Sequence, residues 1–444
     1  MDTPILDFVR KYGDSGFTRF HMPGHKGRGE MGCERWDVTE IHGADSLYEA
    51  EGIIAKSEEN AARLFGSRRT CYSTEGSSQC IRAMLYLALS GRPKGSSRMV
   101  ITARNVHRSF VYAAALLDIE PVWLWPKSCG SLCTCRITAE ELEKAIASEK
   151  EPPAAVYITS PDYLGETADI AAMADVCHKN GTLLIVDNAH GAYLKFLPES
   201  AHSLDLGADM CCDSAHKTLP VLTGGAYLHI SSGLNEKYAE QAKAALALFG
   251  STSPSYLILA SLDACNSLLA GEYRERLGAW VKEINGLKER LRAAGWGIAE
   301  SDPLRLVIKA TKRHSGTAIA AMLRGNCIEC EYADSDFAVL MTTPDNTAED
   351  IKRLEAALGR CAEAVAKQVP LPQVRAEQVV SVREAFFLPH EKIPINKAEG
   401  RICGAPAVSC PPAIPIAVSG ERIGREAIVL FKRYGIKSVE VVKP

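Results

Sequence analysis

A lysine near the middle of the chain has neighbours suited to a nucleophile that bonds to a carbonyl compound. Lys217 lies in the segment Asp213-Ser214-Ala215-His216-Lys217-Thr218, directly after a predicted strand at 209–212. A lysine amine forms Schiff bases with carbonyl compounds when burial or a neighbouring cation lowers its pKa. The segment is a weak indicator by itself, because a solvent-exposed lysine is the commoner case.

An aspartate that ends an apolar strand makes this lysine more informative. Asp187 follows the apolar run 183–186 in the segment Val186-Asp187-Asn188-Ala189-His190-Gly191. A carboxylate at this point can pair with the protonated nitrogen of a pyridine ring and keep that ring an effective electron sink. The alternatives for Asp187 are a helix N-cap and a metal ligand. Together, Asp187 and Lys217 indicate pyridoxal phosphate, a pyridine cofactor that bonds to a lysine.

Two further segments could hold the phosphate and the ring of this cofactor. The turn Gly76-Ser77-Ser78 precedes a predicted helix, whose first backbone N–H groups attract phosphate. The same turn is also a common capping pattern. His107 follows a predicted strand and could stack on a flat ring, although a lone histidine is more often structural. The order phosphate turn, histidine, aspartate and lysine, each at a strand end, is far more specific than any single member.

Strand and helix patterns alternate around these residues. Strands are predicted at 99–102, 121–125, 155–159 and 183–186, and helices at 109–117, 139–148 and 170–179. This alternation predicts an α/β fold with a mostly parallel sheet and helices on both faces. Ligands of such sheets bind at the carboxyl ends of the strands, where Ser160, Asp187 and the Gly76 turn are expected.

The chain is predicted to have four parts. The first is an extended N-terminal arm at 1–45, and the second is a large cofactor-binding domain at 46–295 that ends in a long helical region from about 254. A small α/β domain at 296–368 and a C-terminal domain at 369–444 follow.

The composition excludes several classes of protein. Hydrophobic residues make up 46% and charged residues 24%, which are ordinary values for a globular protein. The net charge of -3, with dispersed lysines and arginines, indicates no nucleic-acid partner. No apolar run is long enough to span a membrane, and the N-terminus lacks a signal-peptide pattern, so we expect a cytoplasmic protein.

Fifteen cysteines are expected to be reduced thiols in such a protein. The cysteines that could act as zinc ligands form two clusters, Cys129, Cys133 and Cys135, and Cys327 and Cys330. Their irregular spacing favours ordinary loop and surface thiols over a zinc site, so we predict no metal.

The chain resembles the Orn/Lys/Arg decarboxylases, pyridoxal-phosphate enzymes of fold type I, in their short form without an N-terminal wing domain. This resemblance implies an aspartate-aminotransferase-like sheet flanked by helices, with smaller C-terminal α+β domains. The matching segments span nearly the whole chain: residues 20–27 (FHMPGHKG), 37–40, 43–47, 160–165 (SPDYLG), 187–191 (DNAHG), 214–220 (SAHKTLP), 251–256, 383–387, 400–403 and 411–415.

The resemblance also implies a role for each residue of the site. Lys217 would carry the cofactor as a Schiff base, Asp187 would hold the pyridine nitrogen, and His107 would stack on the ring. His190 would lie near the ring and help to position the substrate. The phosphate site would comprise Gly76, Ser77, Ser78, Ser214 and His216, with Ser251 or Thr252 of a neighbouring subunit. We therefore expect a homodimer or a higher homo-oligomer with shared active sites.

The reaction implied is the decarboxylation of arginine, lysine or ornithine to the corresponding amine, through the Lys217 Schiff base and a quinonoid intermediate. Arginine is the first expectation and lysine the second. Glu421, by its position in the family, and then Glu384 are predicted to bind the distal cation of the substrate. An ordinary surface charge is the alternative for both glutamates.

Two other readings remain open. Transamination or a lyase reaction is one, since a fold does not fix the chemistry, and an aminotransferase would grip the α-carboxylate with an arginine such as Arg305. The other is a degenerate scaffold with a regulatory role. It is favoured by Glu75, which replaces the asparagine usual in the phosphate turn. A carboxylate there should weaken phosphate binding unless it points away or pairs with a cation.

Overall fold

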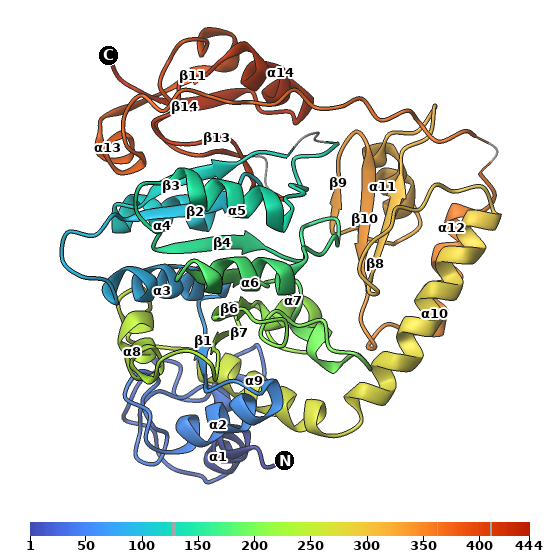
Figure 1. The fold of residues 1–444 in the computed structure, drawn as a ribbon. Coiled ribbons are helices and arrows are strands. Elements are labelled where there is room, and N and C mark those ends of the chain that lie inside the picture. Colours follow the sequence, from blue (N-terminus) through green and yellow to red (C-terminus); the bar gives the residue numbers. More distant parts are fainter. Residues whose placement is uncertain (127–129, 362, 409–410) are drawn as a thin grey trace. The chain divides into compact units, whose positions relative to one another are not determined.

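The structure is a computed structural model that describes residues 1–126, 130–361, 363–408 and 411–444 (Figure 1). These residues form two compact units, each of which is described by itself. The first unit contains residues 1–96 and 170–277, and the second contains residues 97–169 and 278–444. The division of the chain into four domains stays a prediction.

Four strands of the central sheet belong to the first unit, in the order β1-β7-β6-β5. They are β1 (Arg69–Ser73), β7 (Ala226–Ile230), β6 (Met210–Asp213) and β5 (Leu183–Asp187). Strands β5 and β6 are parallel, and β7 runs antiparallel to both β6 and β1. Strand β1 therefore has the direction of β5 and β6, so the carboxyl ends of these three strands lie at one edge of the sheet.

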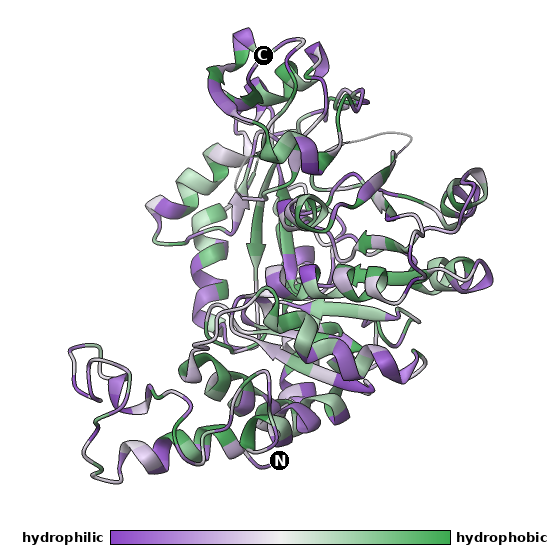
Figure 2. Ribbon diagram, turned by 90° about the vertical axis from the view of Figure 1, so that its left-hand side faces the viewer, coloured by the Kyte–Doolittle hydropathy of each residue, from purple (hydrophilic) through white to green (hydrophobic). Residues whose placement is uncertain are grey.

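Helices surround these strands. Those of the first unit are α1 (Pro4–Gly13), η1 (Glu34–Trp36), α2 (Ile53–Phe65), α3 (Ser77–Ser90), α6 (Ile170–Lys179), η2 (Ala192–Phe196), α7 (Ala215–Thr218), α8 (Glu236–Ala247) and α9 (Tyr256–Ala270). Helix α10 (Tyr273–Ala293) begins in the same unit. Figure 2 shows the strands mainly in the colour of hydrophobic residues, which agrees with the burial of nearly every residue of β1, β5, β6 and β7. Such buried apolar runs are typical of strands that helices cover on both faces.

The second unit contains the parallel strands β4 (Ala155–Thr159), β2 (Met99–Ala103) and β3 (Glu120–Leu124), in that order, with helices α4 (Arg108–Leu117) and α5 (Ala139–Ser148). A separate antiparallel sheet follows, formed by β8 (Arg305–Lys309), β10 (Phe337–Met341) and β9 (Tyr332–Ala333), with helices α11 (Gly316–Gly325) and α12 (Ala348–Leu358). The last elements are α13 (Val382–Phe387), β11 (His390–Pro394), η3 (Ile395–Lys397), β12 (Ala407–Val408), β13 (Pro415–Ala417), α14 (Arg425–Arg433) and β14 (Ser438–Val442).

The predicted alternation of strands and helices is confirmed. Strand β4 and helices α5 and α6 have the predicted bounds. Helix α5 also carries a capping box, in which Thr138 and Glu141 satisfy each other's backbone N–H groups at the first turn. Among the described helices, none combines the length and the apolar character needed to cross a membrane.

Two local predictions were wrong. The arm is not wholly extended, because residues 4–13 form α1, whose buried residues Ile5 and Val9 are one helical turn apart. The backbone N–H groups of Ile5 and Leu6 donate to Asp263 Oδ2, at 2.8 and 3.0 Å, so a residue distant in sequence caps this helix. The long helical region is two helices, and it breaks at Gly271, a residue of low helix propensity.

The described cysteines form no disulfide. Cys129 and Cys410 lie outside the described residues. Among the residues described, three ligands that could hold a metal converge at one place, His202, Cys211 and Asp213, and this group contains no member of the two predicted cysteine clusters.

Candidate active site

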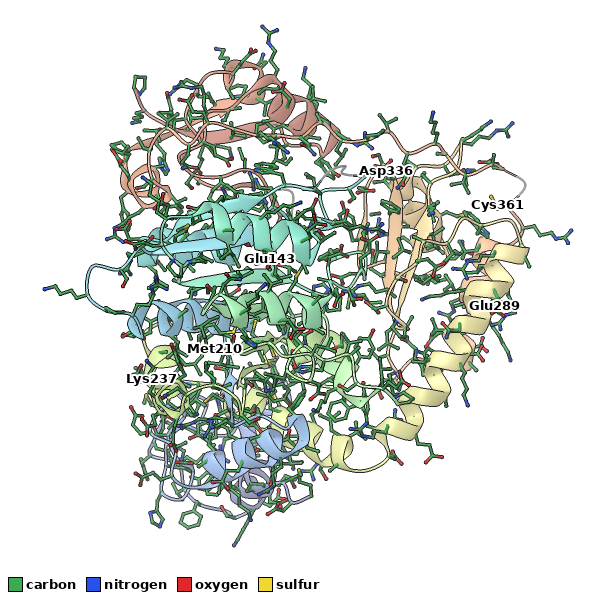
Figure 3. All side chains as sticks on the ribbon, in the orientation of Figure 1. Glu143, Met210, Lys237, Glu289, Asp336 and Cys361 are labelled. Atoms are coloured by element: carbon green, nitrogen blue, oxygen red, sulfur yellow. The ribbon has the colours of Figure 1, made fainter. Side chains whose placement is uncertain are left out.

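Strand β6 delivers Lys217 to the edge of the sheet. The strand begins at Met210, labelled in Figure 3, and ends at Asp213, and the short helix α7 then carries Lys217. Lys217 is half-buried, and its Nζ atom lies 2.9 Å from Nε2 of the buried His190. The amine is therefore sheltered and has a hydrogen-bonded partner through which a proton can pass.

Asp187 ends the neighbouring parallel strand, β5. It lies opposite Cys212 in the sheet register, and its side chain is only 2% exposed. Its Oδ1 atom accepts hydrogen bonds from the backbone N–H of Ala189, at 3.2 Å, and from the Cys212 thiol, at 3.8 Å. Burial, and then the charge of Asp187, raise the pKa of Cys212, so this partner stays a neutral thiol. A buried carboxylate in this place is suited to a cationic ring nitrogen.

The predicted phosphate turn has the geometry of an anion site. Gly76 has a φ of 69°, and a Cβ atom added to it would meet nothing within 4 Å, so the backbone is open to a ligand. Helix α3 begins at Ser77, and Ser214 Oγ donates a hydrogen bond to Ser77 Oγ at 2.8 Å. Two hydroxyl groups and the N-terminus of a helix thus meet, and such a set can bind a phosphate. Ser78 lies in the first turn of the same helix.

Glu75 does not place a buried carboxylate in this turn. Its side chain is exposed, and its backbone N–H donates to Ser73 Oγ at 3.0 Å. The carboxylate that replaces the usual asparagine is therefore solvent-exposed, which weakens the case for a degenerate scaffold.

His216 lies beside the same turn, and one of its ring nitrogens is already hydrogen-bonded to the backbone. Its Nδ1 atom is hydrogen-bonded to the carbonyl oxygen of Gly225 at 3.0 Å, and burial lowers its pKa. The neutral ring then has its proton on Nδ1, so it can donate a hydrogen bond from Nε2 to a phosphate only when it is protonated. Ser251 and Thr252 lie in the exposed loop between α8 and α9, where a second copy of the chain could reach them.

His107 belongs to the second unit and is described there. It is the N-cap of α4, and its Nδ1 atom accepts a hydrogen bond from the backbone N–H of Ser109 at 3.2 Å. The ring is half-buried, and this contact fixes its orientation relative to the helix.

The three charged residues weighed for substrate binding lie in different surroundings. Glu421 is 1% exposed, and its carboxylate already pairs with Arg104, with Oε2 and Nη2 3.1 Å apart. Glu384 is exposed on α13. Arg305 is 1% exposed and forms an ion pair with the buried Asp302, so its charge is balanced within the chain.

A buried polar cluster behind the lysine segment was missed by sequence reasoning. Asp213 Oδ2 accepts hydrogen bonds from Nε2 of His202 and Nε2 of His229, at 3.0 and 3.1 Å, and Asp213 Oδ1 accepts one from Asn188 Nδ2 at 2.5 Å. Burial alone would raise the pKa of Asp213, but His202 and His229 hold it well below its usual value. Asp213 directly precedes Ser214, so its carboxylate links the lysine segment to Asn188, the residue after Asp187. A histidine inside the apolar run of β7 was the available signal, because a buried imidazole needs hydrogen-bond partners.

The cluster predicts a large stability effect. Asp213→Asn replaces an acceptor oxygen with a donor and leaves at least one buried N–H group unpaired, which costs about 1–3 kcal/mol. We expect a lower thermal unfolding midpoint at neutral pH. Because the pKa of Asp213 is depressed in the folded state, its contribution is present above the unfolded value of 3.8 and is lost as the pH falls below it.

The difference in thermal unfolding midpoint between the wild type and Asp213→Asn should therefore become smaller at acidic pH. Asp118→Asn is the control, because Asp118 is exposed and has a φ of 54°, which asparagine tolerates. Equal midpoints for the wild type and Asp213→Asn at neutral pH would refute the role of the cluster.

Comparisons with known proteins show the family of the chain. The family model "Orn/Lys/Arg decarboxylase, major domain" matches residues 3–315, and the model of the C-terminal domain of the same family matches residues 360–434. The chain is similar to an arginine decarboxylase of Bacillus subtilis, with 30% identity over 468 residues that cover 97% of this chain and 93% of the relative.

Solved structures show the same fold. The lysine decarboxylase LdcF of Francisella novicida superposes with a TM-score of 0.81 at 16% identity, covering 99% of this chain and 81% of that one. A serine palmitoyltransferase of Sphingomonas wittichii gives a TM-score of 0.57 at 14% identity, covering 81% of this chain and 83% of that one. The predicted fold class is confirmed: a mostly parallel central sheet flanked by helices, as in the fold-type-I pyridoxal-phosphate enzymes. With two family models that together match most of its length, the chain belongs to the Orn/Lys/Arg decarboxylase family, a family of amino-acid decarboxylases.

Proposed function

We propose that this chain decarboxylates a basic amino acid, with arginine preferred, at a pyridoxal-phosphate site centred on Lys217. The observation that carries the proposal is the hydrogen bond between Lys217 Nζ and His190 Nε2, at the edge of the sheet where β5 ends in Asp187. A nucleophilic amine, a proton acceptor and a buried carboxylate are thus supplied by two adjacent parallel strands and the loops that follow them.

The residues present fit the cofactor. The hydroxyl groups of Ser77 and Ser214 and the N-terminus of α3 would hold the phosphate. The open backbone at Gly76 leaves room for that group. Asp187 would hold the ring nitrogen, and His107 would contact the face of the ring.

The chain's own groups then control charge and protons. When bound, pyridoxal phosphate supplies an electron sink for the electron pair that remains as the α-carboxylate leaves as carbon dioxide. Asp187 would keep the ring nitrogen positively charged. Lys217 would hold the cofactor covalently through its amine, which lies beside His190 Nε2. Lys217 or His190 then returns a proton to Cα.

The choice of arginine rests on relatives. The Bacillus subtilis protein and a relative in Halalkalibacterium halodurans, 28% identical over 100% of this chain and 95% of the relative, are both arginine decarboxylases by name. The constitutive lysine decarboxylase of Escherichia coli is 26% identical over only 58% of this chain. A homodimer is proposed as the active unit, with Ser251 or Thr252 reaching the phosphate site of the neighbouring subunit.

A panel of three substrates tests this proposal. We expect purified, cofactor-loaded protein to release carbon dioxide and agmatine from arginine. Its kcat/KM should exceed the values for lysine and ornithine by about 10-fold, a difference of about 1.4 kcal/mol in the barrier. Amine products are identified by mass spectrometry, with Lys217→Ala as the inactive control. Keto-acid formation without carbon dioxide would refute decarboxylation, whereas a preference for lysine or ornithine would refute only the choice of arginine.

A further inference from the structure

The side chain of Arg104 lies in a cage of groups that suit a guanidinium. Its Nη2 atom is 3.1 Å from Glu421 Oε2, and its Nη1 atom donates to the carbonyl oxygen of Pro415 at 3.1 Å. The guanidinium carbon lies 4.8 Å from the ring centre of Trp123 and 5.4 Å from that of Trp125. A carboxylate, a carbonyl and two indole faces form a set that binds a flat cation well. All of these residues belong to the second unit.

This cage is already filled by the chain's own guanidinium. Arg104 is 9% exposed and Glu421 is 1% exposed, and the backbone N–H of Val418 also donates to Glu421 Oε2, at 2.7 Å. A substrate cation could pair with Glu421 only by displacing Arg104, which would leave a buried arginine without its counter-charge. That loss costs several kcal/mol, more than a substrate's distal group is expected to gain.

The pair joins the C-terminal domain to the segment that carries His107. Arg104 is the first residue after β2, and His107 follows three residues later as the N-cap of α4. The far end of the same segment is held as well, because the backbone N–H of Arg108 donates to the carbonyl oxygen of Ala413 at 2.9 Å. Residues 413–421 thus contact the segment 104–108 on both sides of His107.

We infer that Glu421 and Arg104 are positioning residues: their ion pair fixes the segment 104–108, and through it His107, and Glu421 does not bind the side chain of the substrate. This inference rests on the proposed function, in which His107 contacts the cofactor ring. It makes Glu421 act equally on every substrate, whereas a carboxylate that binds the distal cation would act on each substrate differently.

The variant Glu421→Gln tests the inference with arginine, lysine and ornithine as substrates. The amide keeps the size of the side chain but removes the charge that holds Arg104. We expect kcat to fall by about 10-fold to 100-fold, the range that a displacement of about 1 Å produces. The factor should be the same for all three substrates, and the ratios of their KM values should not change.

The visible absorbance of the bound cofactor gives a second readout, which a merely structural role would not move. The band should shift in Glu421→Gln in the same direction as in His107→Ala. Glu399→Gln is the matched control, because Glu399 pairs with Arg425 on the exposed surface of the same domain, with both side chains more than half exposed. This control should leave kcat and the band unchanged.

If Glu421→Gln does not fold, Arg104→Lys replaces it, since lysine keeps the positive charge but cannot reach the carboxylate and the carbonyl together. A change in the ranking of the three substrates would overturn the inference, and so would unaltered kinetics and absorbance in an active protein. A wild type that has neither the cofactor band nor an amine product would instead refute the proposed function, and with it the role assigned to His107.

Discussion

Lys217→Ala is expected to lower kcat by at least about 10⁴-fold and to remove the absorbance band of the covalently held cofactor. The variant lacks both the amine that we propose anchors the cofactor and one of the two groups that we propose return a proton to Cα. His190 alone cannot replace it, because an imidazole does not form the same bond to an aldehyde. Kinetics with arginine and a visible spectrum of the cofactor-loaded protein measure the two effects.

The matched control is Lys237→Ala. Lys237 lies on helix α8 of the same unit, and its side chain is exposed (Figure 3). The control should retain the band and the wild-type kcat. A Lys217→Ala protein that keeps the band would show that another lysine holds the cofactor.

Asp187→Asn is expected to lower kcat by about 10²-fold to 10³-fold, the usual loss when one electrostatic stabiliser of a transition state is removed. The amide has the size of the carboxylate, and its oxygen can still accept the N–H of Ala189, so β5 should remain intact. The charge that we propose keeps the ring nitrogen protonated is lost. Phosphate binding should change much less, because the groups proposed to hold the phosphate belong to Ser77, Ser214 and helix α3.

Kinetics and a titration of the variant with cofactor separate these two effects. Asp118→Asn again serves as the control, because Asp118 is an exposed aspartate at the end of α4. Wild-type kcat in Asp187→Asn would show that Asp187 does not act on the ring and is only a structural carboxylate.

The sequence is most informative where one local pattern determines one element. Buried apolar runs and capping residues identify β4, α5 and α6 with their true bounds, because strands and helix ends depend on neighbouring residues. The edge of the sheet follows from the same alternation, and it brings Asp187 and Lys217 to adjacent strand ends. The contact between Lys217, on α7, and His190, in the loop after β5, lies beyond these two strand ends and was not itself predicted.

Contacts between distant segments could not be predicted from these patterns. The type of Glu421 and its place in the family suggest a substrate carboxylate, but its partner is Arg104, 317 residues earlier in the chain. Helix α1 depends in the same way on Asp263, which lies more than 250 residues away. The cluster around Asp213 combines residues from two strands and two loops. No local sequence pattern indicates that these residues contact one another.

Reduction of the cofactor-loaded protein with borohydride, followed by mapping of the labelled peptide by mass spectrometry, identifies the lysine that holds the cofactor. Reduction converts the bond between cofactor and lysine into a stable amine, so the label marks the lysine that held the cofactor. We expect a pyridoxyl group on Lys217 and on no other lysine. A label on a different lysine, or an unlabelled protein that still decarboxylates arginine, would contradict it.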